Sequence, residues 1–512
     1  MKFVKRLIAA LVMIGLAALV LYMAPREADS LAAVGLDEND DGVIYKDTLV
    51  IWYTDADLAE YIQSAAVSFS DKPENQHLRI MPVFAEALEY LENINRASVE
   101  FAGPDLFVLG HDNLEKAYLA GLAEIVADEY FDTVKADYPQ VGLHAVTYQD
   151  KILGYPFYFE TSALVFNLTH LEEMVKSKIE TDADEAAAAQ SMLDLELHGP
   201  EEEITEVPAY MEEVLRLKND LVYIENQVAS LKPKTFEDLK DFASDYDAPA
   251  MVEGLLKWDV NDIFYNYFFV GDSIRVGGEA GDEIDDIDIY NPEAIRSMRM
   301  YQNLNQFFAI ETKEAKYSRI VEEFIAGKWV YTVATTDIIA KLDEAARNGE
   351  FPYEYGILRT PNIDEDTPTR PLSMVSSIVI NGYSDYKADA NRFAAYLAGD
   401  FAENLYLRTG KVPALRRAVP DNEQLQVFSD EFARSIPLPK MIATSNFWIQ
   451  LQVTFARIWQ GADANEQLRT LSEQIMSQVT GAPFTEELIV EILAVEEVEY
   501  LDEEELRREA ME

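Results

Sequence analysis

The sequence contains no cysteine among its 512 residues. This absence excludes disulfide bonds, thiolate metal ligands and thiol nucleophiles in one step. Histidine is also scarce, with five residues, at positions 77, 111, 144, 170 and 198. None of them forms an HExxH pattern or another close ligand spacing, so the sequence offers no histidine-based metal site and implies no cofactor.

Basic residues are few as well. Lysine and arginine together number 42 against 93 aspartates and glutamates, which gives a formal net charge of −51. Such a charge repels nucleic acid and anionic lipid, so partners of these kinds are disfavoured. It favours solubility in a salty or exposed setting, where charges are screened over ~10 Å at ordinary ionic strength.

The chain is long and has enough apolar residues to fold. With 512 residues, 49% of them hydrophobic and 11% aromatic, it can bury a sizeable core and should form more than one lobe. The composition is that of a globular protein and not of a disordered one.

The N-terminus has the charge order of a secretory segment. Lys2, Lys5 and Arg6 precede an apolar run from Leu7 to Met23, which predicts a signal peptide or an N-terminal membrane anchor over residues 1–23. The length of the run does not decide between the two. In both cases the body of the protein is expected outside the cytoplasm, either tethered or secreted.

An acidic linker is expected over residues 24–46, because the segment lacks apolar periodicity. Part of it, DENDDGVIYKDT, begins like a calcium loop at Asp37, Asn39 and Asp41. Position twelve of the pattern is Thr48 and not the usual glutamate. A linker is therefore favoured over a metal site.

Two stretches place a carboxylate where a strand is expected to end. Residues 106–109 are an apolar run that stops at GHDN, which contains Asp112, and residues 155–159 are a second run that stops at Glu160 before the strand resumes. Ligands of open α/β sheets bind beyond the carboxyl ends of strands. Two acids there predict a site for a hydroxyl-rich ligand, although a loop Asp and an exposed Glu would give the same spacing.

The order of these and later motifs resembles a known family. GPDLFVLGHD, AGLAEI and GYPFYFE are followed by PKTFEDL at 233–239, EEFIAGKWVYTV at 322–333, YGILRTP at 355–361, RPLSMVSSIVIN at 370–381 and SNFWIQLQ at 445–452. Together they resemble the extracellular solute-binding proteins, family 1, of the maltose-binding protein type, which serve ABC importers. The family often carries a lipid-attachment cysteine, which this chain lacks.

The resemblance implies an α/β, two-lobed periplasmic-binding-protein-like fold of class II. Lobe I is then expected over 47–160 and 371–430, and lobe II over 161–370 and 431–484. The Glu-rich segment 171–232 interrupts the family pattern and predicts a helical hairpin insertion, turning at Gly199 and Pro200. Its apolar residues step by three and four, which is typical of a coiled-coil seam: Val214, Leu217, Leu221, Ile224, Val228 and Leu231. Residues 485–512 are expected to form an acidic C-terminal helix.

The resemblance also implies a set of substrate-binding residues. Asp55 or Asp57 would provide the first polar contact, and Trp448 stands at the position of the family's sugar-stacking tryptophan. The full expected set is Asp55, Asp57, Asp112, Glu160, Trp258, Asp337, Trp448 and Gln452. Leu109 and Asp337 stand where maltose-binding protein has further stacking rings, which implies a different or smaller carbohydrate.

The expected function is that of an extracytoplasmic substrate-binding protein of an ABC importer. It would be a monomer that binds a carbohydrate between two hinged lobes and delivers it to the membrane permease subunits, without a chemical step. One alternative is a glycosidase-like enzyme that uses Asp112 and Glu160 as acid and base. Another is a surface sugar receptor that serves a sensor, and the role of the 171–232 hairpin stays open between docking and simple packing.

Overall fold

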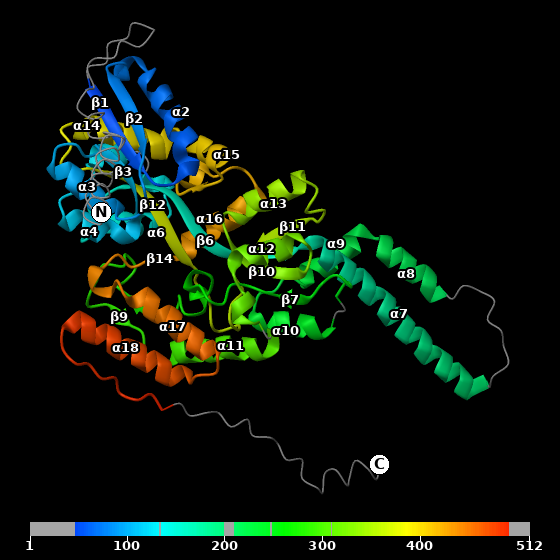
Figure 1. The fold of residues 1–512 in the computed structure, drawn as a ribbon. Helices are drawn as coiled ribbons and strands as arrows, with labels where there is room; N and C mark the ends of the chain where they lie inside the picture. The colour runs from blue at the N-terminus through cyan, green and yellow to red at the C-terminus, as the bar shows by residue number, and fades with distance from the viewer. Residues whose placement is uncertain (1–46, 133–134, 199–208, 246–247, 309, 491–512) are drawn as a thin grey trace, which may run out of the picture. The chain divides into compact units, whose positions relative to one another are not determined.

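The computed structural model describes residues 47–490 except 133–134, 199–208, 246–247 and 309. The chain divides into two compact units, each with both helices and strands (Figure 1). Unit 1 comprises Met1–Pro139, Val146–Tyr158 and Val375–Val419, and unit 2 comprises Gln140–Ala145, Phe159–Met374 and Pro420–Glu512. The predicted N-terminal segment, the linker with its calcium-like pattern and residues 491–512 lie outside the described residues.

Unit 1 is built on a sheet with the strand order β2-β1-β3-β12. β1 (Asp47–Tyr53) pairs in parallel with β2 (Leu78–Phe84) and with β3 (Leu106–Gly110). β12 (Leu372–Ile380) runs antiparallel to β3. The apolar, β-prone runs at 48–53 and 79–84 predict strands, as the run at 106–109 does, and all three strands are confirmed.

The helix predicted between the first two strands is α2 (Ala59–Ser70). Its buried face holds Tyr61, Ile62, Ala65 and Phe69, as the apolar spacing predicts. The hydroxyl of Tyr61 donates to the carbonyl of Leu397 at 2.6 Å, which satisfies a polar group that burial would otherwise penalise.

The other elements of unit 1 complete its layers around this sheet. They are α3 (Tyr90–Val99), α4 (Leu114–Leu119), α5 (Asp128–Phe131), β4 (Thr147–Tyr148), β5 (Lys151–Ile152), α14 (Lys387–Ala395), α15 (Leu405–Thr409) and β13 (Val412–Pro413). The sequence predicts helices over 388–399 and 401–409. Both are present with shorter α-helical parts, because a π-helical turn extends α14 and a short 3-10 turn precedes α15.

In unit 2 the strands pair around the long strand β6 (Tyr155–Asn167). β6 pairs antiparallel with β10 (Trp329–Thr335) and with β11 (Tyr355–Leu358), and β10 pairs in parallel with β7 (Gly254–Leu256). The first part of β12 pairs in parallel with β14 (Ile436–Pro437). Unit 2 also contains a set of helices, several of which share a buried apolar cluster with these strands.

Those helices are α6 (Gln140–Val146), α10 (Phe236–Asp245), α11 (Pro292–Phe308), α12 (Tyr317–Ile325), α13 (Ile338–Arg347), α16 (Glu423–Arg434), α17 (Phe447–Trp459) and α18 (Ala464–Thr480). The small strands β8 (Arg275–Val276) and β9 (Ile287–Asp288) form a separate pair. α17 and α18 pack on each other and on α11, and residues 485–490 form no helix.

The predicted helical insertion is present in unit 2 as three helices. α7 (Leu168–His198) lies beside α8 (Ala209–Asn219) and α9 (Leu221–Ser230) (Figure 1). The turn expected at 199–200 lies outside the described residues. The predicted continuous seam is wrong at one point: Asp220 accepts the amide of Tyr223 and starts a new helix there, and Leu221 is 79% exposed.

Two strands belong to both units. The boundary between the units falls after Tyr158 within β6 and after Met374 within β12. Neither unit is therefore formed by one contiguous stretch of chain.

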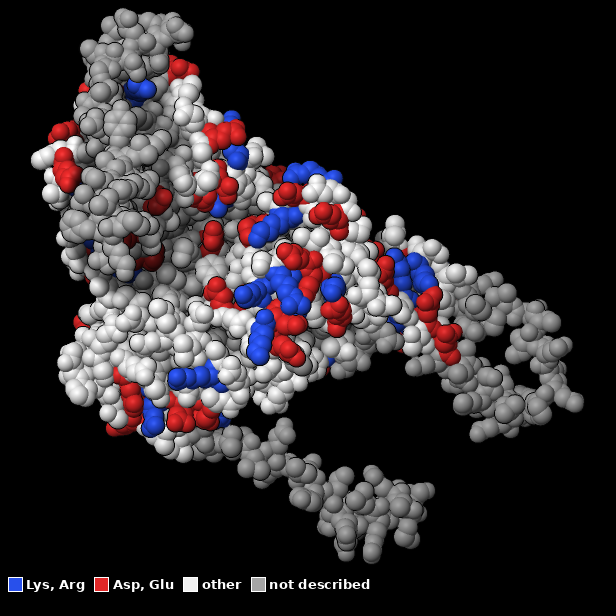
Figure 2. All heavy atoms as spheres, viewed as in Figure 1, with Lys and Arg blue, Asp and Glu red and all other residues white. Residues whose placement is uncertain are grey.

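The surface reflects the acidic composition. On the face shown in Figure 2, lysine and arginine side chains lie among aspartates and glutamates and form no separate basic patch. Among the residues that the structure describes, no helix is both long and apolar enough to span a bilayer.

Candidate functional site

In unit 1 the turn after β1 carries Asp55 and Asp57. Asp55 caps the short turn that follows, because its Oδ1 accepts the amide of Asp57 at 3.0 Å. The Nζ of Lys411 lies 2.8 Å from Asp55 Oδ2 and 3.9 Å from Asp57 Oδ2. The expected acids are therefore partly neutralised by Lys411, a contact that the sequence pattern does not predict.

The turn after β3 carries Asp112 at the same edge of the sheet. β1 and β3 are parallel neighbours, so their carboxyl ends lie side by side. Asp112 Oδ2 accepts a hydrogen bond from the side-chain amide of Asn113 at 2.9 Å. A Cβ added to Gly110 would lie 2.6 Å from Asp112 Oδ1. Glycine at 110 thus leaves room for the carboxylate to fold back over the turn.

Burial dominates the electrostatics of Asp112. Removal of water raises the pKa of its carboxyl above the ordinary value, and the bonds from Asn113 and from its own backbone amide only partly offset this. The neighbouring His111 is fully buried, and the Val375 amide donates to its Nδ1 at 3.0 Å. His111 thus fixes the turn to β12, while Asp112 is half-buried.

In unit 2 the structure corrects the position of Glu160. It does not end a strand, because β6 continues without a break from Tyr155 to Asn167. Its neighbours explain the continuity: Phe159 stacks on Phe432 with ring centroids 4.0 Å apart, and Thr161 Oγ1 donates to the carbonyl of Leu372 at 2.8 Å. Glu160 is half-buried within the strand.

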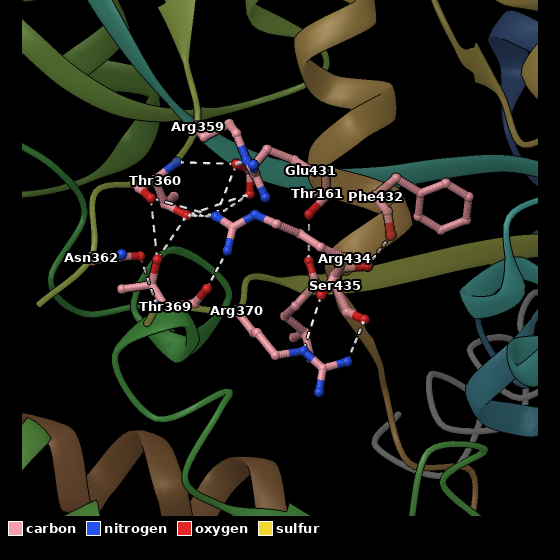
Figure 3. Close-up of polar contacts among 11 residues, drawn as sticks. Thr161, Arg359, Thr360, Asn362, Thr369, Arg370, Glu431, Phe432, Arg434 and Ser435 are labelled. Atoms are coloured by element: carbon pink, nitrogen blue, oxygen red, sulfur yellow. Dashed lines mark hydrogen bonds and ion pairs between the residues drawn. The ribbon is translucent and has the colours of Figure 1, made fainter. Parts of the chain in front are cut away.

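A buried ionic cluster lies beside this part of β6 (Figure 3). Glu431 is fully buried, and burial raises the pKa of its carboxyl although Arg434 and Arg359 act against the shift. Arg434 Nη2 donates to Glu431 Oε1 at 2.9 Å, and the amide of Thr360 donates to the same oxygen at 3.2 Å. The cluster connects α16 to the segment after β11. Phe432 of the same helix packs on Phe159, the residue before Glu160 in β6.

Asp337 follows the carboxyl end of β10. Thr335 is paired with Ser162 of β6, so Glu160 and Asp337 each lie two residues beyond this pair at the same end of the two strands. Within unit 2 the register therefore places two of the predicted acids at the same end of two paired strands.

A tyrosine pair extends the Asp337 region. Tyr317 donates its hydroxyl to Asp337 Oδ1 at 2.6 Å, Thr335 Oγ1 donates to the same oxygen at 2.6 Å, and Lys341 pairs with the carboxylate. Tyr265 stacks on Tyr317 with a centroid separation of 4.7 Å. Burial acts to raise the pKa of Asp337, but these three donors outweigh it and hold the pKa below its usual value.

The two tyrosines were not predicted. Residues 251–269 are rich in aromatic side chains, and the family resemblance points only to Trp258 among them. Because Tyr317 lies in another segment, its stack with Tyr265 depends on tertiary packing, which the sequence pattern does not report.

Trp448 and Gln452 lie on α17. Asn446 is the N-cap residue, as expected for Ser445 or Asn446, although its side chain makes no capping bond. The Trp448 ring is half-buried and contacts Tyr267 at 5.3 Å, while Gln452 is exposed one turn further on. α17 also packs on the turn that holds Tyr265, so Trp448 and the tyrosine pair belong to one region of unit 2.

Trp258 requires a correction. Its ring is only 1% exposed, and it packs against Phe269, Phe308 and Trp459 in the core of unit 2. Its Nε1 donates to Asn266 Oδ1 at 2.8 Å. With both ring faces covered, we assign Trp258 to the core and leave it out of the candidate site.

No metal centre emerges from the part of the chain that the structure describes. Within residues 47–490, apart from the gaps given above, no group of three or more histidine or acidic side chains is arranged to hold an ion.

These features define a class of protein. The fold is that of the two-lobed solute-binding proteins: the Staphylococcus aureus extracellular solute-binding protein in complex with maltose aligns with a TM-score of 0.63 and 18% identity, over 85% of this chain and 98% of that one. A cyclo/maltodextrin-binding protein complexed with maltotetraose aligns with a TM-score of 0.64 and 17% identity, over 85% and 98% of the two chains.

The family itself is identified from the sequence. The bacterial extracellular solute-binding protein family matches residues 83–431, and the chain belongs to this family. The maltotriose-binding protein of Pyrococcus abyssi (strain GE5 / Orsay) is 20% identical over 407 residues, which is 76% of this chain and 74% of that protein.

Proposed function

We propose that this protein binds a carbohydrate outside the cytoplasm and delivers it to the permease subunits of an ABC importer. Membership of the extracellular solute-binding family supports the binding role and the location. The maltose, maltotetraose and maltotriose named for its relatives support the class of ligand. The protein would be held near the membrane, or released, by residues 1–23.

The observation that carries the proposal is the chemistry at the strand ends. In unit 1, Asp55, Asp57 and Asp112 follow two adjacent parallel strands. In unit 2, Glu160 and Asp337 share one edge with Tyr265, Tyr317 and Trp448. Carboxylates accept hydrogen bonds from sugar hydroxyls, and rings cover the apolar faces of a sugar, so the chemistry of each set suits a polyol.

The carbohydrate is proposed to be shorter than a long malto-oligosaccharide. Leu109 is a buried strand residue and provides no aromatic ring for stacking. At the other position where maltose-binding protein has a stacking ring, this chain has the charged Asp337. The tyrosine pair beside Asp337 supplies one aromatic surface in that region. Fewer platforms limit the number of sugar units that can be held.

Thermal-shift screening against a sugar panel tests the proposal. A ligand at 100 times its Kd should stabilise the protein by about 2.7 kcal/mol, and we expect at least one short oligosaccharide to do so. The variants Trp448→Ala and Asp112→Ala should each lose that shift.

Ile449→Ala is the matched control, because Ile449 is an exposed neighbour of Trp448 on α17. It should keep the full shift. A sugar that stabilises all three variants as well as the unmodified protein would show that the site lies elsewhere, and the proposal would then fail.

A further inference from the structure

A pocket lies in unit 1, away from the candidate site. It is a cavity of about 200 Å³, lined by Ser98, Phe101, Gly103, Pro104, Asp105, Asn381, Tyr383, Ser384, Asp385 and Tyr386. Asp105 immediately precedes β3, and Asn381 immediately follows β12, its antiparallel neighbour. The pocket therefore lies at the opposite end of these strands from Asp112.

Three aromatic side chains surround this cavity and remain open to solvent. Phe101 is 93% exposed, Tyr383 is 45% exposed and Tyr386 is 37% exposed. Single exposed apolar residues are ordinary, but three rings around one cavity form a patch of the kind that marks a binding site.

The backbone of Phe101 adds a second observation. Phe101 has φ +61°, in the left-handed region that bulky residues avoid. It follows the C-cap Glu100 of α3, and the amide of Ala102 donates to the carbonyl of Ala97 at 2.9 Å. Glycine usually takes this position after a helix, so a phenylalanine here keeps an exposed ring at a conformational cost.

The polar side of the pocket is held rigidly. Asp105 accepts the amide of Val50 at 2.8 Å and the hydroxyl of Ser384 at 2.5 Å. Asn381 Nδ2 donates to Ser98 Oγ at 2.8 Å and to the carbonyl of Pro104 at 2.7 Å. A carboxylate can accept further bonds beyond these, and Asp385 beside it is exposed.

The rings and the carboxylates around the pocket together favour one class of ligand. An apolar occupant would use the exposed rings but not the remaining acceptor capacity of the Asp105 and Asp385 carboxylates. A neutral ring that carries hydroxyls on its edge and C–H groups on its face can use both sides of the pocket. The cavity is smaller than the ~300 to 1,000 Å³ pockets that enclose drug-sized ligands, so it suits a single sugar unit.

We propose that the pocket around Phe101, Tyr383, Asp105 and Asp385 is a second carbohydrate-binding site, which takes one sugar unit of a soluble glycoside or of a surface polysaccharide. It goes beyond the proposed transport function, because unit 1 alone provides all of its residues. A chain with this site could keep a polysaccharide or a released fragment close to the receptor.

The test uses the full chain with Trp448→Ala, so that binding at the candidate transport site is already weakened. Methyl α-glucoside and N-acetylglucosamine are titrated and followed by saturation-transfer-difference NMR. We expect one of them to bind, and Phe101→Gly to weaken that binding by about tenfold, because a stacking ring is lost. Phe101→Tyr should retain it.

The glycine variant also controls for folding. Glycine adopts the left-handed conformation without strain, so Phe101→Gly should not lower the melting temperature. Leu407→Ala removes an equally open side chain from α15 of unit 1, outside the pocket, and should leave binding unchanged. Equal binding by Phe101→Gly and its parent, or no binding of either glycoside, would overturn the proposal.

A second arm separates the two sources of sugar. Co-sedimentation with insoluble starch that requires Phe101 indicates a polysaccharide ligand, while glycoside binding without co-sedimentation indicates a soluble one. The outcome is independent of the transport proposal, since that proposal fails on Trp448 and Asp112 and this one fails on Phe101.

Discussion

Asp112 in unit 1 and Asp337 in unit 2 follow strands in the same way but have opposite electrostatics. Burial raises the pKa of Asp112, whose carboxylate accepts a hydrogen bond from the side-chain amide of Asn113. Three donors, from Lys341, Thr335 and Tyr317, hold the pKa of Asp337 down. The comparison shows that a position at a strand end does not determine the role of an acid. The hydrogen bonds of Asp337 are made within unit 2, whereas Asp112 can still accept hydrogen bonds from a ligand.

The aromatic residues show a similar contrast within unit 2. Trp258 is enclosed in the core, while Trp448 is half-buried at the start of α17. The largest expected effect tests this difference: Trp258→Ala should lower the free energy of unfolding by about 3 to 5 kcal/mol. Trp448→Ala should cost less than about 2 kcal/mol, because the half-buried ring buries less apolar surface. Denaturant unfolding measures both, and equal losses would remove the distinction.

The next effect concerns the acid of unit 2. Asp337→Asn should destabilise the protein by about 1 kcal/mol at pH 7, a value reduced for the partial exposure of the carboxylate. Because folding lowers this pKa, the stabilisation is present above the ordinary value of 3.8 and is lost as the pH falls through the folded pKa. The deficit of the variant should therefore disappear in acid. Tyr317→Phe, which keeps the ring, should reproduce part of it.

Asp112→Asn should behave in the opposite way. Folding raises this pKa, so the charged form carries a penalty that is absent below 3.8 and appears as the pH rises through the folded pKa. We expect the variant to be as stable as the unmodified protein at pH 7, or more stable by up to about 1 kcal/mol. Unfolding measured from pH 3 to pH 7 checks the sign. A loss of stability at neutral pH would place Asp112 with Asp337 as a structural acid.

The smallest effect on stability is expected from Gly110→Ala. The added Cβ would meet Asp112 Oδ1 at 2.6 Å, and this atom can move because it is at the end of a side chain. Residue 110 has φ −63°, which alanine also adopts. Stability should change by less than about 1 kcal/mol, while affinity for a sugar found in the thermal-shift panel should fall. Unchanged affinity would show that the position of the Asp112 carboxylate does not matter for binding.

Much of the fold could be predicted from local patterns. The alternating and apolar runs located β1, β2, β3 and β10, and the spacing of Tyr61, Ile62, Ala65 and Phe69 located α2. These patterns work because each element buries one face against a neighbour. The order of motifs then indicated the family, which the match over residues 83–431 confirms.

Other features depended on contacts that no local pattern contains. Glu160 looked like a strand end, but Phe159 and Thr161 are held by α16 and β12, so the strand continues. Asp220 fits a helical spacing and yet caps a new helix. Among many aromatic residues, the sequence did not distinguish the enclosed Trp258 from the stacked Tyr265. The roles proposed for the site residues and the lobe boundaries stay predictions.

The sharing of β6 and β12 between the two units has a consequence for biosynthesis. Residues 376–380 of β12 pair with residues 106–110 of β3, so unit 1 cannot complete its sheet until the ribosome has also made residues 159–374 of unit 2. Contacts so distant along the chain slow folding, because a long loop must close first. During translation the backbone groups of β3 that pair with β12 therefore lack their partners. Holdase chaperones or the timing of export would have to protect this strand from aggregation.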